Sequence, residues 1–263
     1  MSLLIGLALA QVDPACEGQT QFYEDEALQA DHLLNYFALA VSNSPVHKPV
    51  PHEPGHGAVG VKFMVIPPLS CERRLVLGST KTEDTNKAPM APMPTLSFAF
   101  PELGPVVLYG SVGYVPPVTL FGTRNVILSG EFGVGLPMDN GAEFALRYHH
   151  TLMKTVAEIA TPFSEGDPEE LDFYSGSTLG VDLMGGYPLG PVTPYVALGF
   201  TDASTFFYIG DDGVVGNNTT PFTGMTASVG VAGVVKERID LAGEFYAAPN
   251  YLYTGRLRAS VLF

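Results

Sequence analysis

Residues 124–152 read RNVILSGEFGVGLPMDNGAEFALRYHHTL, which is the pattern of two strands joined by a tight turn. Apolar side chains recur at every second position from Val126 to Leu136, and the positions between them are mostly small or polar. After the turn residues PMDNG, the alternation resumes from Phe144 to Leu152. Alternation with a period of two predicts strands that have one apolar and one polar face. The stretch therefore predicts a β-hairpin with faces of opposite polarity.

The same alternation recurs along residues 57–263 and predicts ten strands. Their expected ranges are 58–66, 94–100, 105–115, 124–136, 142–152, 171–187, 192–201, 222–235, 238–248 and 251–263. Alternation alone also fits a soluble β-sandwich. Short links join the second strand to the third, the fourth to the fifth, the sixth to the seventh and the eighth to the ninth. The other links are longer, except at Pro249-Asn250.

Short and long links in alternation are typical of a membrane barrel with tight turns at one end and long loops at the other. We therefore predict an all-β fold, a transmembrane antiparallel up-and-down β-barrel of about ten strands, with eight or twelve as alternatives. An even strand number brings both ends of the barrel to the side of the short turns.

Composition supports a lipid-facing barrel. The 263 residues hold 13 Lys+Arg and 27 Asp+Glu, a net charge of 13 − 27 = −14, which argues against a nucleic-acid partner. Charged residues make up 15% of the chain, against roughly 25% in soluble domains, and the mean hydropathy is +0.20. A spanning helix needs about 20 consecutive apolar residues, and no stretch of this sequence approaches that length. The apolar residues are divided among strands instead.

Residues 1–10 are expected to be a signal peptide. Leu3 to Ala10 forms a short apolar run that ends in Ala-Leu-Ala before Gln11, although the usual positive charges before such a run are missing. An apolar N-terminal strand or anchor is the alternative. Export would expose Cys16 and Cys71 to an oxidising compartment. Two cysteines are compatible with a disulfide there, but the sequence does not settle whether they pair.

Residues 11–56 are predicted to be a short helical and irregular extension before a barrel of residues 57–263. Residues 24–41 have apolar positions at helical spacing and acidic residues in the first turn, where the helix dipole favours them. The Pro- and His-rich residues 42–57 are predicted to be a surface linker. On the periplasmic side, the extension could enter the lumen as a plug or lie beneath it. The candidate metal ligands are His47, His52 and His56, but their spacing matches no compact metal motif; we expect neither a metal nor a cofactor.

The C-terminal residues 251–263, YLYTGRLRASVLF, carry a family resemblance. They resemble the last strand of bacterial outer-membrane β-barrel proteins, which ends in Phe with apolar residues at alternate positions before it. The matching face is Tyr253, Gly255, Leu257, Ala259, Val261 and Phe263. The resemblance implies a Gram-negative outer-membrane location and recognition by the barrel assembly machinery through Tyr253, Leu257, Val261 and Phe263. The sequence has no Trp, which is usual in the aromatic girdles of such barrels.

The polar strand faces are expected to line the lumen. The charged candidates are Lys62, Glu131, Glu143, Arg147, His149, Asp182, Asp240, Glu244, Arg256 and Arg258. They could line a small polar pore, or acids and bases of neighbouring strands could pair and fill the lumen. A barrel of eight strands is filled by its own side chains, whereas sixteen or more strands leave a channel. Ten strands lie nearer the filled end.

Three functions remain open from the sequence. The first is a small channel or transport-type, porin-like barrel. The second is a non-conducting structural or interaction barrel that binds a partner through its long loops. The third is an outer-membrane lipid or peptide hydrolase built on His149 and Thr151, which we do not expect because no orienting acid is identifiable. Expected partners are outer-membrane lipid and another membrane or periplasmic protein.

Overall fold

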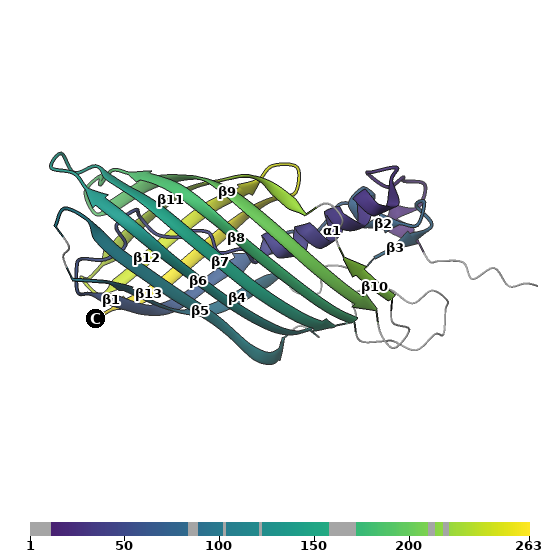
Figure 1. The fold of residues 1–263 in the computed structure, drawn as a ribbon, viewed down its shortest axis with the longest axis horizontal. Helices are drawn as coiled ribbons and strands as arrows, with labels where there is room; N and C mark the ends of the chain where they lie inside the picture. The colour runs from purple at the N-terminus through teal and green to yellow at the C-terminus, as the bar shows by residue number, and fades with distance from the viewer. Residues whose placement is uncertain are drawn as a thin grey trace, which may run out of the picture.

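Ten antiparallel strands form a closed barrel in the computed structural model (Figure 1). The structure describes residues 12–83, 89–101, 104–120, 123–157, 172–209, 214–217 and 221–263. The barrel strands are β1 (Gly57–Val65), β4 (Met90–Ala99), β5 (Val107–Leu120), β6 (Thr123–Pro137), β7 (Glu143–Ala157), β8 (Asp172–Gly186), β9 (Val192–Ile209), β11 (Phe222–Val235), β12 (Ile239–Ala248) and β13 (Leu252–Leu262). The short strand β10 (Val214–Asn217) pairs with the end of β9.

The first and last strands close the barrel. Strand β13 pairs with β1 in the register that joins Ala58 to Leu262. The backbone N–H of Phe263 donates to the carbonyl of Gly57 at 2.9 Å, and the Gly57 N–H donates back at 3.1 Å. A closed barrel leaves no unpaired sheet edge. The predicted ten-stranded up-and-down barrel is therefore confirmed.

The two ends of the barrel differ in their connections. Tight turns at residues 138–142, 187–191 and 236–238 lie at the short-turn end. At the long-loop end, the connection from β1 to β4 carries the short helix α2 (Cys71–Arg74) and the hairpin of β2 (Leu75–Val76) and β3 (Lys81–Thr82). Both ends of the barrel lie at the short-turn end, as predicted.

One predicted loop is wrong. The link between the third and fourth strands was expected to be long, but β5 continues to Leu120 and β6 begins at Thr123. The pairing of these strands shifts between Val115 and Val118, where Pro116 and Pro117 stand. A proline cannot donate to the strand ladder and is tolerated at a bulge. The prolines interrupt the alternation of apolar and polar residues without ending the strand. The strand therefore extends beyond the residues that the alternation predicted.

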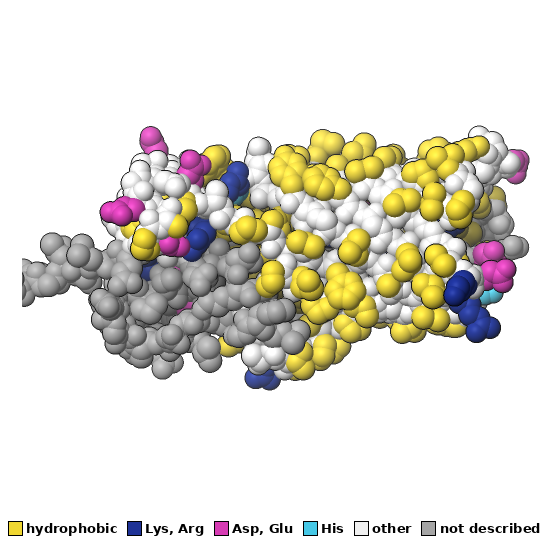
Figure 2. All heavy atoms as spheres, turned by 180° about the vertical axis from the view of Figure 1, so that it is seen from behind, with side chains coloured by type: hydrophobic (Ala, Val, Ile, Leu, Met, Phe, Trp, Pro, Cys, Tyr) yellow, Lys and Arg dark blue, Asp and Glu magenta, His cyan; other side chains and the backbone are white. Residues whose placement is uncertain are grey.

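The outer face of the barrel is apolar. Figure 2 shows apolar side chains spread over the barrel wall and charged ones gathered toward the two ends. Leu183 on β8 is 63% exposed and Met225 on β11 is 65% exposed. This outward apolar band with a polar interior is the arrangement of membrane-spanning barrels.

Helix α1 (Glu26–Ala40) lies at the long-loop end and enters the mouth of the barrel (Figure 1). Asp25 caps it, because its carboxylate accepts from the amides of Ala27 and Leu28 at 2.8 and 3.1 Å. The helix predicted for residues 24–41 is therefore present. No helix in the described part of the chain is long and apolar enough to cross a membrane.

Residues 41–52, which we call the lumen segment, correct the prediction of a surface linker. Every residue from Val41 to His52 is buried except Lys48, which is half-buried. The segment runs from α1 at the long-loop end toward Gly57 at the short-turn end. Residues 41–56 could reach about 50 Å when extended, enough to pass through the barrel. The wall surrounds the segment on all sides and offers it both polar groups and an apolar cluster that includes Val46 and Val50, so its sequence shows no amphipathic period.

The location of the extension also differs from the expectation. It was expected on the periplasmic, short-turn side, either inside the lumen as a plug or beneath it; residues 41–52 lie inside the lumen, but α1 and the residues before it lie at the opposite end (Figure 1). The alternation of apolar and polar residues shows where the first strand of the barrel begins. It carries no information on how the preceding chain reaches that point. The predicted signal peptide at residues 1–10 lies outside the described residues.

Candidate functional site

The lumen gathers the charged side chains that the sequence analysis singled out. Arg147 and Arg256 are fully buried, at 0% exposure. The buried set comprises Lys62, Glu131, Glu143, Arg147, His149, Asp182, Asp240, Glu244, Arg256 and Arg258. They project inward because they alternate with apolar residues along strands whose other face is exposed. Burial of so many charges requires partners for each.

One group of wall charges forms an ion-pair network. Arg147 Nε lies 2.6 Å from Glu131 Oε2, and Arg147 Nη1 donates to Asp182. Ser111 Oγ donates to Glu131 Oε1 at 2.8 Å. A second pair joins Arg258 to Asp240. Neighbouring strands therefore neutralise each other's charges, as the filled-lumen alternative required.

The remaining cations bind the backbone of the lumen segment. Arg256 donates to the carbonyl of Ser42 and, at 3.2 Å, to that of Leu39. Lys62 Nζ donates to Ser44 O at 3.0 Å and to Asn43 Oδ1 at 2.7 Å.

The carbonyls that Arg256 binds lie at the C-terminal end of α1, and this position explains why a cation stabilises them. The last carbonyls of a helix have no partner within it and carry partial negative charge. Arg256 thus caps the C-terminus of α1 from the barrel wall, and its guanidinium also lies 4.0 Å from the ring centre of Tyr246. Arg147, already paired with acids, adds a hydrogen bond to the carbonyl of Asn43.

Two wall carboxylates bind amides of the same segment. Glu244 Oε2 accepts from Val46 N at 2.9 Å and from the hydroxyl of Tyr195 at 2.9 Å. Glu143 accepts from Val50 N at 3.3 Å and pairs with Lys48 Nζ at 2.9 Å. Carbonyls therefore meet cations and amides meet carboxylates along the length of the segment. The wall holds an extended backbone by charge-assisted hydrogen bonds.

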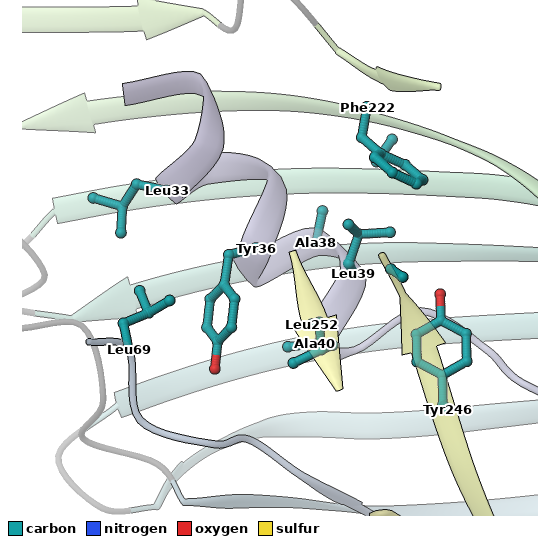
Figure 3. Close-up of a cluster of buried hydrophobic side chains, with 11 residues drawn as sticks. Leu33, Tyr36, Ala38, Leu39, Ala40, Leu69, Phe222, Tyr246 and Leu252 are labelled. Carbon is teal, nitrogen blue, oxygen red and sulfur yellow. The ribbon is translucent and has the colours of Figure 1, made fainter. Parts of the chain in front are cut away.

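Apolar contacts seal the mouth at the long-loop end. Leu33, Tyr36 and Leu39 of α1 belong to one buried cluster with the wall residues Phe222 and Leu252 (Figure 3). On the other side of the helix, Leu34 and Val41 belong to a second cluster, completed by the wall residues Met64, Met93, Val115, Ile127, Met153 and Tyr174. The Tyr174 hydroxyl donates to Leu34 O at 2.8 Å. The helix thus fills the mouth of the barrel.

A small polar cavity remains beside the segment. Its volume is about 10 Å³, and Ser44, His149, Asp182, Thr226 and Tyr246 are among the residues that line it. That volume is roughly the space of one water molecule. Among the described residues, this space beside the segment therefore holds no more than a water molecule.

The three candidate metal ligands do not form a site. His47 Nε2 lies 3.2 Å from Glu131 Oε1, His52 Nε2 lies 2.6 Å from Ser97 Oγ, and His56 is exposed. Within the described ranges, no group of three or more His, Cys, Asp or Glu side chains could hold a metal ion. Two of the histidines that were assigned to a linker, His47 and His52, make contacts inside the barrel instead.

His149 and Thr151 lie deep in the lumen rather than at the outer rim. His149 Nε2 is 3.7 Å from Asp182 Oδ2, and that carboxylate is already paired with Arg147. Both His149 and Thr151 are buried against the filled interior. Asp182 is therefore shared between Arg147 and His149 and is not a dedicated partner of the histidine.

Residues 12–29 and 70–82 form a compact body at the long-loop end, which we call the N-terminal unit. Cys16 and Cys71 form a disulfide, which answers the question that the sequence left open. The side-chain amide of Gln29 donates to the carbonyl of Leu75 at 2.7 Å, and Phe22 N donates to Glu72 O at 2.9 Å. These contacts tie the start of the chain to the connection between β1 and β4.

His32 joins the unit to the last barrel turn. Its ring stacks on Tyr251 with centroids 4.6 Å apart, and Arg73 donates to its Nε2 and to the carbonyl of Asn250. Burial, followed by the nearby Arg73 charge, lowers the pKa of His32 from 6.5 to about 4. The imidazole is therefore neutral at neutral pH, as its role as an acceptor from Arg73 requires.

The terminal-strand residues lie on the outer face. Tyr253, Leu257, Val261 and Phe263 are between 57% and 62% exposed, on the side away from Arg256 and Arg258.

Sequence reasoning missed the groups that the wall binds, namely the backbone of residues 39–50. One feature was available before the structure. Four wall cations and five wall carboxylates nearly balance, which favours a filled lumen over a pore of one charge. The sequence could not show that an extended segment of the same chain would satisfy half of them.

Comparisons with known proteins add limited information. No family model and no curated protein matches the chain. Among solved structures, the chain is similar to the translocator domain of autotransporter NalP from Neisseria meningitidis, at 9% identity over 90% of this chain and 94% of that one, with a TM-score of 0.47. It is also similar to a mutant of the TodX monoaromatic hydrocarbon channel, at 12% identity over 81% and 69% of the two chains, with a TM-score of 0.33. The fold assignment rests on the strand pairing described above.

Proposed function

We propose that the chain is a bacterial outer-membrane barrel that acts as a small channel or transport-type protein, closed here by its own lumen segment. The observation that carries the proposal is the set of wall charges whose hydrogen bonds go to the backbone of residues 39–50. These bonds can be exchanged for bonds to water, so the wall remains polar when the segment moves. A wall of charged side chains is suited to polar solutes.

Two further features support the membrane location. The outer wall is apolar around the barrel, as lipid contact requires. The terminal strand ends in Phe263 and resembles the strand that the outer-membrane assembly machinery reads. Under this proposal the partners are outer-membrane lipid and that machinery. The proposal assigns the protein neither an enzymatic activity nor a cofactor.

A second candidate function has its own observation. The disulfide-linked N-terminal unit is held at the long-loop end, where a membrane barrel meets the outside. A barrel that never opens would serve as an anchor for this unit and would bind a partner through it. The two candidates differ in whether the lumen ever conducts.

Conductance of the reconstituted full-length protein in planar bilayers, recorded with and without dithiothreitol to cover both states of the Cys16–Cys71 disulfide, separates them. The test variant is Glu244→Gln with Glu143→Gln, which keeps the shape of both side chains and removes the charges that bind Val46 and Val50. Asp240→Asn is the matched control, because Asp240 lies on the same strand as Glu244 and pairs with wall residue Arg258.

A hydrogen bond to a charged group contributes about 1.5–3 kcal/mol, so loss of two charges should raise the open fraction at least about tenfold. The wild-type protein and Asp240→Asn should open rarely. Silence of the folded double variant at all voltages, both with and without dithiothreitol, would reject the channel function and favour the anchor function.

A further inference from the structure

The disulfide closes a covalent ring that passes through the barrel. From Cys16 the chain runs along α1 into the mouth and continues as the lumen segment to the short-turn end. It returns toward the long-loop end as β1, which is a strand of the barrel wall. It then reaches Cys71 at the long-loop end, where the bond closes the ring over 55 residues of sequence. One limb of this ring lies in the lumen and the other is a strand of the wall.

This path leaves the lumen segment no way out. Gly57 is fixed at the short-turn end by its two hydrogen bonds to Phe263, while the disulfide keeps residues before α1 at the long-loop end. The chain between these points cannot run outside the barrel, because lipid offers no partner for backbone N–H and C=O groups. If the N-terminal unit were instead drawn down the lumen, Cys71 and its connection would follow it inward. A chain segment occupies the lumen in every arrangement that keeps the bond.

We infer that the Cys16–Cys71 disulfide is a redox lock that makes the plug captive, so that the lumen can be cleared only after this bond is reduced. The inference rests on the proposed channel function. Once the bond is cleaved, residues 12–56 can leave toward the short-turn end, where β1 begins. The segment that closes the lumen is then displaceable rather than permanent.

The chemistry of release is thiol–disulfide exchange with a dithiol reductant. A thiolate of the dithiol attacks Cys71 Sγ, which is the more accessible sulfur because Cys71 is half-buried and Cys16 is fully buried. The Cys16 thiolate leaves and takes a proton. The second thiol of the reductant then attacks the mixed disulfide, which releases Cys71 as a thiol and leaves the reductant as a disulfide. Two electrons and two protons pass to the protein.

Reduction removes the covalent tie and leaves the non-covalent ones. Gln21 and Ser79 exchange two hydrogen bonds, and Glu26 accepts from the amides of Leu77 and Gly78. Most of these groups are exposed or partly buried, so water competes for them. A covalent tether keeps a displaced group at high effective concentration. Loss of the disulfide therefore lets the lumen segment stay out of the lumen once it has been displaced.

The test records planar-bilayer currents from the full-length protein in three forms. These are the oxidised protein, the protein reduced with dithiothreitol, and the variant with Cys16→Ser and Cys71→Ser. Hydrogen exchange at the amides of Val46 and Val50 is measured on the same samples, because those amides bind wall carboxylates only while the segment is in place. Addition of dithiothreitol to the serine variant controls for effects of the reagent elsewhere.

We expect full-lumen openings and exchange at these amides to rise at least about tenfold in the reduced protein and in the serine variant. The serine variant should not respond to dithiothreitol. Full-lumen openings that are equally frequent in the oxidised and reduced forms would overturn the disulfide lock, while the proposed channel function would stand. Faster exchange on reduction without current in any form would support the lock and reject the channel. Unchanged exchange together with no current in any form would reject both the lock and the channel function.

Discussion

Arg147 shows how single residues organise the lumen. It is fully buried and donates to Glu131, to Asp182 and to the carbonyl of Asn43. Charges taken out of water are costly unless they are paired and hydrogen-bonded. One guanidinium therefore neutralises carboxylates on the two wall strands that flank its own and also binds the backbone of the lumen segment.

Replacement of Arg147 by Met should destabilise the protein strongly. The change leaves Glu131 and Asp182 without their central cation, and breaking such a buried network costs about 3–5 kcal/mol. The measurement is denaturant unfolding in detergent, with Lys154→Met as control because Lys154 is an exposed cation on the same strand. Equal stability of the two variants would contradict the network.

The alternation of residues identified the wall charges but not their partners. Lys62, Glu143 and Glu244 could be assigned to the polar face of a strand from position alone. Which group each one binds depends on how strands far apart in sequence meet across the lumen. Val46 and Glu244, for example, are 198 residues apart, and no local pattern records such a contact.

At the scale of elements, α1 connects the lumen segment to the N-terminal unit. Its start is tied to residues 70–82 and its end is capped by Arg256. The sequence predicted the helix from apolar spacing and its acidic first turn. It missed the burial of the following residues, because proline and histidine were taken as the composition of an exposed linker. In this lumen His47 and His52 meet the polar wall residues Glu131 and Ser97 instead.

Acidification should loosen the docking of α1. The pKa of His32 is lowered to about 4 in the folded state, against 6.5 when exposed. The stabilising contribution is therefore complete above pH 6.5 and is lost as the pH falls from 6.5 toward 4. Each unit in that window costs about 1.4 kcal/mol.

Hydrogen exchange of α1 amides, corrected for the intrinsic effect of pH, measures this loss between pH 7 and pH 5. His32→Asn removes the titrating group and should flatten the dependence. If the variant kept the pH response of the wild type, another group would be responsible.

At the scale of the whole molecule, the barrel separates an apolar outside from a polar inside. This division was predictable, because alternation along each strand fixes both faces, and alternating link lengths indicate closure. The strand number was also predictable from the count of alternating stretches. The path of the preceding chain was not, because residues 12–52 form no strand whose register could place them.

A charge on the outer wall tests this division. Val181 lies on β8 and is 45% exposed, and Val181→Arg should lower stability by about 2–4 kcal/mol in a bilayer, the cost of arginine near the midplane. Leu77→Arg is the matched control, since Leu77 is 48% exposed in the N-terminal unit, where water replaces lipid. Equal tolerance of both changes would argue against a lipid-facing wall.

The central claim is that residues 41–52 run through the lumen of a membrane-inserted barrel. The most direct measurement is a solid-state NMR correlation between the amide nitrogen of Val46 and the side-chain carboxyl carbon of Glu244 in lipid bilayers. Their hydrogen bond of 2.9 Å predicts a strong cross-peak, alongside the cross-peaks between the paired strands β12 and β13. Strand cross-peaks without the Val46–Glu244 signal would contradict the account.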